Sequence, residues 1–133
     1  MSKNNIKKAY IGISRKEFLL RFFELYNVLQ KDEKKLTDSE ARLLTEILLL
    51  PEKYKYSRLS TSARRVLLDT VRETGWKLSY QGLTQLVRAL TEKGVLIEDA
   101  DGEKVPLPQF EALIDKKRTE FGLEMTFQID NSK

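Results

Sequence analysis

The sequence predicts a mainly α-helical protein with a small β element of two strands. Two observations support this fold class. Apolar residues recur at steps of three and four through five separate segments, most of which begin at a capping residue or proline and stop at glycine or proline. Two short segments, 95–98 and 124–129, have instead the character of strands, and the second alternates strictly between apolar and polar residues.

The first predicted helix spans residues 15–30. Ser14 and Glu17 have the spacing of a capping box, in which each side chain accepts a hydrogen bond from the other residue's backbone N–H. The apolar stripe of this helix is rich in aromatic residues, so we expect it to pack on the core or on a copy of itself. The stripe consists of Phe18, Leu19, Phe22, Leu25, Tyr26 and Leu29.

The second predicted helix spans residues 37–49. Thr37 and Glu40 form another capping box at its start, and Pro51 stops it because proline lacks the backbone N–H that a helix interior needs. Leucine and isoleucine residues along one side supply a buried face. A charged connector separates this helix from the first, and we assign no function to it.

Two further helices are predicted over residues 62–74 and 80–93. Each is preceded by hydroxyl residues that can cap its first turn, and Ser79 is the cap of the later one. Gly75 and Gly94 end them, because glycine adopts the left-handed conformation that terminates a helix without strain.

The last third of the chain is predicted to contain a strand at 95–98, a helix at 108–120 and a strand at 124–129. Pro108 suits the first position of the helix, and Gly122 follows its end. If the two strands pair with one another, the helix is inserted between them. We expect this insertion to be the feature most specific to this protein.

The composition argues against catalysis. The 133 residues include no cysteine and no histidine, which removes thiolate chemistry, disulfides and the most common general base. Asp99 and Asp101 are a carboxylate pair that could bind Mg²⁺, but acids that flank a glycine are more often turn residues. No glycine-rich phosphate loop is present. We therefore expect no enzymatic activity, no cofactor and no metal site.

The sequence also lacks the apolar run of roughly 18 residues that crosses a bilayer, and its first residues do not form a secretion signal. These features predict a protein of the cytosol, either of a cell or of an infected host, with no membrane partner.

Charge is distributed unevenly along the chain. Residues 1–35 hold nine basic and four acidic residues, a net charge of +5, whereas residues 95–133 hold five basic and nine acidic residues, a net charge of −4. Residues 36–94 hold ten basic and seven acidic residues, a net charge of +3. A chain polarised in this way can associate head to tail with copies of itself or with a neighbour.

The order helix, helix, turn, helix, strand, strand resembles the winged-helix variant of the helix-turn-helix. The segments "LTDSEARLLTEILLL", "RLSTSARRVLLDTV" and "LSYQGLTQLVRALTEKGVL" are similar to small helix-turn-helix proteins of large tailed bacteriophages, especially the crAss-like phages of gut Bacteroidetes. The resemblance covers residues 36–98. It implies a phage setting, in which such folds serve as regulators, as DNA-packaging factors or as pieces of the connector and collar.

This resemblance suggests a division into two parts. Residues 1–35 form a basic N-terminal arm and an amphipathic helix, and residues 36–133 form a winged-helix-like domain with a helix inserted in its wing.

A DNA-binding function predicts that the outward face of helix 80–93 lies in the major groove. Glutamine can pair with adenine and arginine with guanine, while residues at the start of the helix contact phosphates. The residues of this candidate face for DNA or a partner are Lys77, Ser79, Tyr80, Gln81, Thr84, Gln85 and Arg88. Against this function, the loop "EDADGE" would bring four acidic residues toward a polyanion.

An assembly function is favoured by the polarised charge and the aromatic first helix. It predicts that residues 1–30 contact the acidic region 98–120 of an adjacent subunit or of a different virion protein. The candidate contacts are Lys7, Lys8, Phe18, Phe22, Tyr26, Glu98, Asp99 and Asp101. The leading expectation is a repeated structural subunit of a virion's head–tail region (portal, connector or collar), assembled in the host cytoplasm with copies of itself and other virion proteins. The alternative is a double-stranded DNA-binding protein, either a transcription regulator or a packaging factor.

Overall fold

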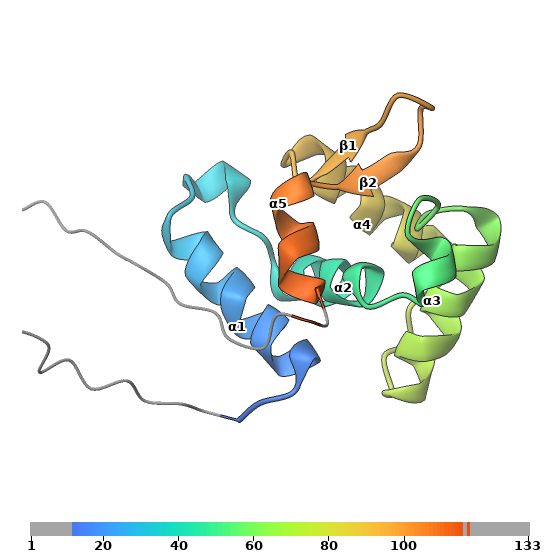
Figure 1. The fold of residues 1–133 in the computed structure, drawn as a ribbon, viewed down its shortest axis with the longest axis horizontal. Coiled ribbons are helices and arrows are strands. Elements are labelled where there is room, and N and C mark those ends of the chain that lie inside the picture. The colour runs from blue at the N-terminus through green and yellow to red at the C-terminus, as the bar shows by residue number, and fades with distance from the viewer. Residues whose placement is uncertain (1–11, 116, 118–133) are drawn as a thin grey trace, which may run out of the picture.

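The structure is a computed structural model that describes residues 12–115 and residue 117 (Figure 1). The described chain is mainly helical and carries one small antiparallel sheet, as predicted. Its elements in order are α1 (Arg15–Val28), α2 (Asp38–Leu48), α3 (Thr61–Glu73), α4 (Tyr80–Glu92), β1 (Leu96–Glu98), β2 (Lys104–Pro106) and α5 (Pro108–Glu111), and three short 3-10 helices at Asp32–Lys34, Glu52–Tyr54 and Ala112–Ile114.

The helices begin at the predicted caps. Ser14, Thr37 and Ser79 each accept a hydrogen bond from a backbone N–H in the first turn of the helix that follows, and Ser60 does the same for α3. The capping box of α2 is complete, because the Glu40 carboxylate also accepts from the Thr37 N–H at 2.9 Å. These contacts satisfy backbone donors that the helices themselves leave unpaired.

Helix α2 is the centre of the hydrophobic core. In Figure 1 it lies in the middle of the molecule, with α1 on one side and α3 on the other. Its apolar residues pack in one buried cluster with Leu19 and Phe23 of α1, so the amphipathic first helix shares the core of the rest of the chain. The α2 residues of the cluster include Leu43, Leu44 and Ile47, and further members come from α3, α4, β1 and α5, among them Leu67, Val71, Leu83, Val87, Leu90, Leu96 and Phe110.

The sheet differs from the predicted pairing. β1 pairs with β2, with Leu96 opposite Pro106 and Glu98 opposite Lys104. The predicted strand at 124–129 lies outside the described residues. A partner six residues away costs less chain entropy to close than one nearly thirty residues away. The helix that begins at Pro108 therefore follows the hairpin instead of lying inside it.

The turn of the hairpin contains the local interactions that specify this pairing. The Asp99 carboxylate accepts hydrogen bonds from the backbone N–H groups of Asp101 and Glu103, at 2.9 and 3.0 Å. Gly102 has a φ of +78°, in the left-handed region that favours glycine. Asp99 is thus a turn residue, which is the role that acids flanking a glycine were expected to have.

Helix α5 is shorter than the predicted 108–120. It ends at Glu111, continues as a 3-10 turn to Ile114, and reaches extended backbone at Asp115. Arg15 of α1 donates to the carbonyl oxygens of Leu113 and Asp115 at 2.9 and 3.3 Å. The Arg15 side chain, from the other end of the chain, thus binds carbonyl oxygens that would accept backbone hydrogen bonds in a longer helix. The sequence of 108–120 alone therefore did not reveal where α5 ends.

Among the described residues, no helix is long and apolar enough to cross a membrane.

Candidate functional site

The turn between α3 and α4 holds the start of α4 in place. Gly75 ends α3 with a φ of +90°, and the buried side chain of Leu78 anchors the turn in the core. Arg72 of α3 donates from both Nε and Nη2 to the Leu78 carbonyl, at 3.2 Å each. The Arg42 guanidinium lies 4.5 Å from the centre of the Trp76 ring, a cation–π contact that fixes the other side of the turn. Trp76 is therefore half-buried against the protein itself.

Helix α4 has one buried face and one exposed face. Leu83, Val87 and Leu90 are buried, whereas Gln81, Gln85 and Arg88 are exposed and Tyr80 is 52% exposed. The candidate face that the sequence predicted for DNA or a partner is accordingly open to solvent, except at Thr84, which is half-buried and donates to the Tyr80 carbonyl at 3.2 Å.

Two predicted residues precede this helix. Ser79 is exposed, but its Oγ accepts from the Gly82 N–H at 2.9 Å, so its side chain serves as the cap. Lys77 is exposed and has no hydrogen bond or ion pair within residues 12–115.

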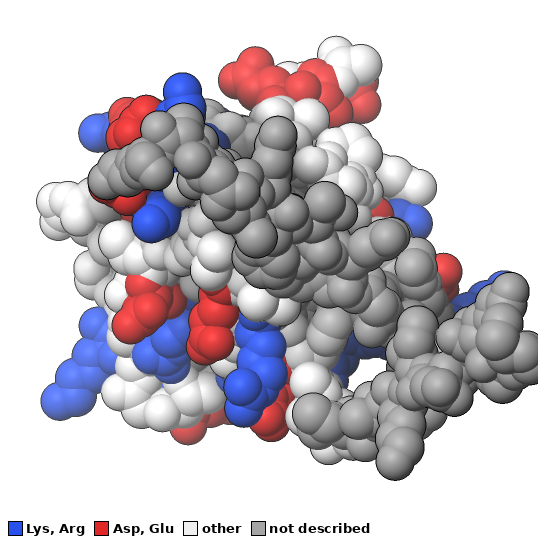
Figure 2. Space-filling model, turned by 90° about the vertical axis from the view of Figure 1, so that its left-hand side faces the viewer, with Lys and Arg blue, Asp and Glu red and all other residues white. Residues whose placement is uncertain are grey.

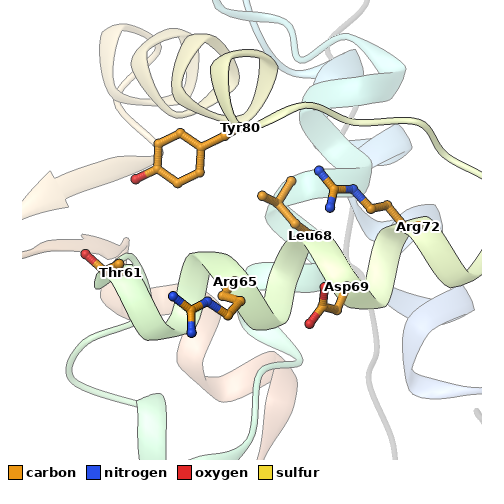
Figure 3. A pocket seen from close by; sticks show the side chains of 6 residues that line it. All are labelled: Thr61, Arg65, Leu68, Asp69, Arg72 and Tyr80. Atoms are coloured by element: carbon orange, nitrogen blue, oxygen red, sulfur yellow. The ribbon is translucent and has the colours of Figure 1, made fainter.

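A partly open groove of about 190 Å³ lies between α3 and the start of α4. It is lined by Thr61, Arg65, Leu68, Asp69, Arg72 and Tyr80. Figure 3 shows Tyr80 reaching from α4 toward α3, which contributes the other five side chains. We call it the α3–α4 groove. Nothing in the sequence showed that the arginines of α3 share a groove with Tyr80.

The arginines of α3 differ in what they bind. Arg64 donates from Nε to the Leu59 carbonyl at 2.9 Å, and Arg72 holds the turn, so both stabilise local structure. Arg65 is exposed and has no hydrogen bond or ion pair in the described part of the chain. Its guanidinium can therefore contact a ligand without breaking an existing interaction.

The hairpin carries the opposite charge. Glu98, Asp101 and Glu103 are exposed, and none of them forms an ion pair with any base that the structure describes. We call these three residues the acidic tip. Figure 2 shows an acidic cluster at the top of the molecule, where the hairpin projects. Asp99 is only half-exposed, because its carboxylate is used by the turn.

The aromatic residues of α1 are packed within the chain. Phe22 and Tyr26 contact the ring of Phe110 in edge-to-face arrangements, with centroids 6.1 and 6.0 Å apart. Phe18 contacts Phe22 at 6.4 Å. All three are half-buried, and desolvation by burial raises the pKa of Tyr26. Of the residues predicted as assembly contacts on α1, Phe22 and Tyr26 thus pack on α5 of the same chain, and Phe18 packs on Phe22.

The apolar surface that α1 leaves open is at its C-terminal end. Leu25 is 43% exposed, Val28 65% and Leu29 69%. The predicted arm residues Lys7 and Lys8 lie outside the described residues.

Within residues 12–115 there is no group of three or more acidic residues placed to bind a metal ion. Comparisons with protein-family models, with curated proteins and with solved structures find no match to the chain.

Proposed function

We propose that this chain is a non-enzymatic winged-helix protein that binds other proteins, as a repeated subunit of the head–tail region of a bacteriophage virion. The order of α2, α3, a short turn, α4 and the hairpin supports the winged-helix assignment. In this assignment α4 occupies the position of the reading helix, and the hairpin that follows it is the wing.

The acidic tip is the observation that carries the proposal. A wing that lies on DNA approaches the phosphate backbone, where each like-charged contact at about 4 Å costs about 1 kcal/mol even at the dielectric constant of water. Glu98, Asp101 and Glu103 would all contribute to this repulsion, since no described base neutralises them. A wing of this charge suits a basic protein surface.

Two further features support a building block. Helices α1 and α5 add a layer on α2 beyond the three helices and the wing of a minimal winged helix, and Leu25, Val28 and Leu29 give this layer an exposed apolar end. Subunits of assemblies commonly expose such patches where a neighbour packs. The phage setting rests on the resemblance of residues 36–98 to helix-turn-helix proteins of tailed phages.

Quantitative mass spectrometry of purified particles tests the proposal. We expect the chain in mature virions at a fixed copy number that matches a ring or collar. Detection only in infected cells, with none in particles, would contradict a structural role.

A second candidate function is binding of double-stranded DNA, as a regulator or a packaging factor. The exposed face of α4 favours it, because Gln81, Gln85 and Arg88 are types of residue that read bases in the major groove. Lys77 and Arg65 would then contact phosphates. Selection of binding sites from a random duplex pool, followed by mobility-shift assays, distinguishes the two functions. A tight, sequence-specific complex would favour the DNA function.

A further inference from the structure

We propose that the acidic tip of one copy of this chain docks in the α3–α4 groove of a second copy. This inference rests on the proposed protein-binding function and names the partner as the chain itself. It also differs from the sequence prediction, in which the basic N-terminal arm receives the acidic region of a neighbour.

The groove has the size and donors for a carboxylate side chain. Its volume of about 190 Å³ is many times the roughly 10–15 Å³ in which a cavity can hold one water molecule, so it can accept a side chain. Arg65 lines the groove with no partner in the described chain, and a guanidinium can bind a carboxylate through two parallel hydrogen bonds. The half-exposed hydroxyl of Tyr80 stands opposite as a further donor.

The other charged residues of the groove permit this docking. Arg72 uses Nε and Nη2 for the Leu78 carbonyl, and no described residue accepts from its Nη1. Asp69 is the one acid in the lining, and Figure 3 shows it beside Arg65 on the same flank of α3, one helical turn away. No ion pair joins these two side chains among the described residues. The lining holds two arginines and one acid, so its net charge is positive.

The acidic tip is suited to enter such a groove. Figure 1 shows the hairpin projecting from the body of the molecule, and its turn is held by the two hydrogen bonds to Asp99 and by the Asp99 N–H, which donates to the Glu103 carbonyl at 2.8 Å. A loop that is already ordered loses little conformational entropy when it binds. Asp101 and Glu103 stay exposed and have no basic partner in the described part of the chain, so their carboxylates are available to a basic group of a second molecule.

Exchange of charges between the two surfaces tests the contact. One variant carries Arg65→Glu, and the other carries Asp101→Lys with Glu103→Lys. Each variant alone places like charges opposite each other, so we expect its self-association to weaken at least tenfold relative to the wild type. An equimolar mixture of the two variants places opposite charges at both kinds of contact, and we expect it to associate about as strongly as the wild type.

Sedimentation velocity of the full chain measures the association. We expect it to weaken between about 0.1 M and about 1 M salt, since the screening length falls from about 10 Å to about 3 Å. Lys31→Glu is the matched control, because Lys31 is exposed, distant in sequence from both surfaces and unpaired within the described residues. Circular dichroism establishes that each variant is folded, and Arg65→Gln replaces Arg65→Glu if the latter is not.

Several outcomes would overturn the docking. These are a wild-type chain that stays monomeric at millimolar concentration, single variants that associate normally, and a mixture that does not associate. If Lys7→Glu and Lys8→Glu abolish association but Arg65→Glu does not, the acidic tip binds the N-terminal arm and not the groove. Loss of DNA binding by Arg65→Glu with unchanged self-association would make the groove a phosphate site.

The test is separable from that of the proposed function. If the chain is found in particles but its charge variants associate normally, the structural role is supported and the docking contact is contradicted. If the mixture of variants restores association but the chain is absent from particles, the docking contact is supported and the virion role is contradicted.

Discussion

The two sides of the molecule differ in how many of their charged side chains form ion pairs within the chain. Around α1, α2 and α5 several bases and acids meet: Lys16 pairs with Glu46 at 2.8 Å, Lys93 at the end of α4 pairs with the buried Glu40, and Arg58 binds Glu111 through Nη1 and Nη2. On the side of α3, α4 and the hairpin, Arg65, Lys77, Arg88 and the acidic tip have no such partners among the described residues.

This difference distinguishes charges that stabilise the fold from charges that are available for recognition. Charges that are paired within the chain contribute to its stability and have little left to offer a ligand. Unpaired charges on an exposed surface contribute little to stability, so their positions are free to serve recognition. The contrast is why we propose that the second side carries the charge-dependent contact, and it can be tested residue by residue.

The largest effect is expected from Phe110→Ala on the paired side. Phe110 is 1% exposed and meets the rings of Phe22, Phe23 and Tyr26, so its removal leaves a cavity where α1 and α5 join. We expect a loss of about 3–5 kcal/mol in the free energy of unfolding, measured with urea. Leu29→Ala on the exposed end of α1 is the control, with a change within about 0.5 kcal/mol.

A loss similar in the two variants would mean that α1 and α5 do not depend on each other as the ring contacts indicate.

Glu111→Ala should have the next largest effect. Arg58 is buried, its Nε has no partner among the described residues, and removal of Glu111 leaves the rest of its guanidinium unpaired. We expect a loss of about 1.5–3 kcal/mol in the free energy of unfolding, the usual contribution of hydrogen bonds to a charged group. The double variant Arg58→Met, Glu111→Leu should recover much of this loss, because a buried apolar pair has no desolvation cost.

Equal destabilisation in the single and double variants would contradict the assignment of this pair as a buried charge that needs its partner.

Substitutions on the unpaired side should be nearly silent for stability. Arg88→Ala and Gln85→Ala are each expected to change the free energy of unfolding by no more than about 0.5 kcal/mol. If α4 reads DNA, each should also weaken binding to a selected site by about 1–3 kcal/mol. We expect instead weak binding that is indifferent to sequence and is lost at moderate salt. A mobility-shift titration of both variants against the wild type measures the difference.

The smallest effect concerns the pH dependence of stability on the paired side. Burial raises the pKa of Tyr26 above its ordinary value of 10.0, so the folded chain holds this proton more tightly than the unfolded chain. The contribution of Tyr26 to the free energy of unfolding is complete below pH 10.0 and is lost as the pH rises through the folded-state pKa. Unfolding experiments at alkaline pH should show a smaller decline for Tyr26→Phe than for the wild type, and parallel curves would contradict the burial of this hydroxyl.

The positions of the first four helices could be predicted from the sequence, because local capping residues determine where helices begin and end. Ser14, Thr37 and Ser79 cap helices at the predicted places, and Gly75 and Gly94 follow α3 and α4 with positive φ. These signals could be recognised because each acts within one turn of chain. The exposed face of α4 was predictable for the same reason, since the period of a helix assigns every residue to a side.

The tertiary structure alone decided which surfaces meet. The end of α5 and the packing of the α1 aromatic residues on Phe110 depend on contacts between distant parts of the chain. Arg15, for example, binds the carbonyl of a residue 98 positions away. The α3–α4 groove is also a product of packing, because the periodicity of α3 places Arg65 on a face but does not say that Tyr80 lies across from it. Spacing within a helix is fixed by backbone geometry, whereas the angle and depth at which two helices pack depend on all the side chains between them.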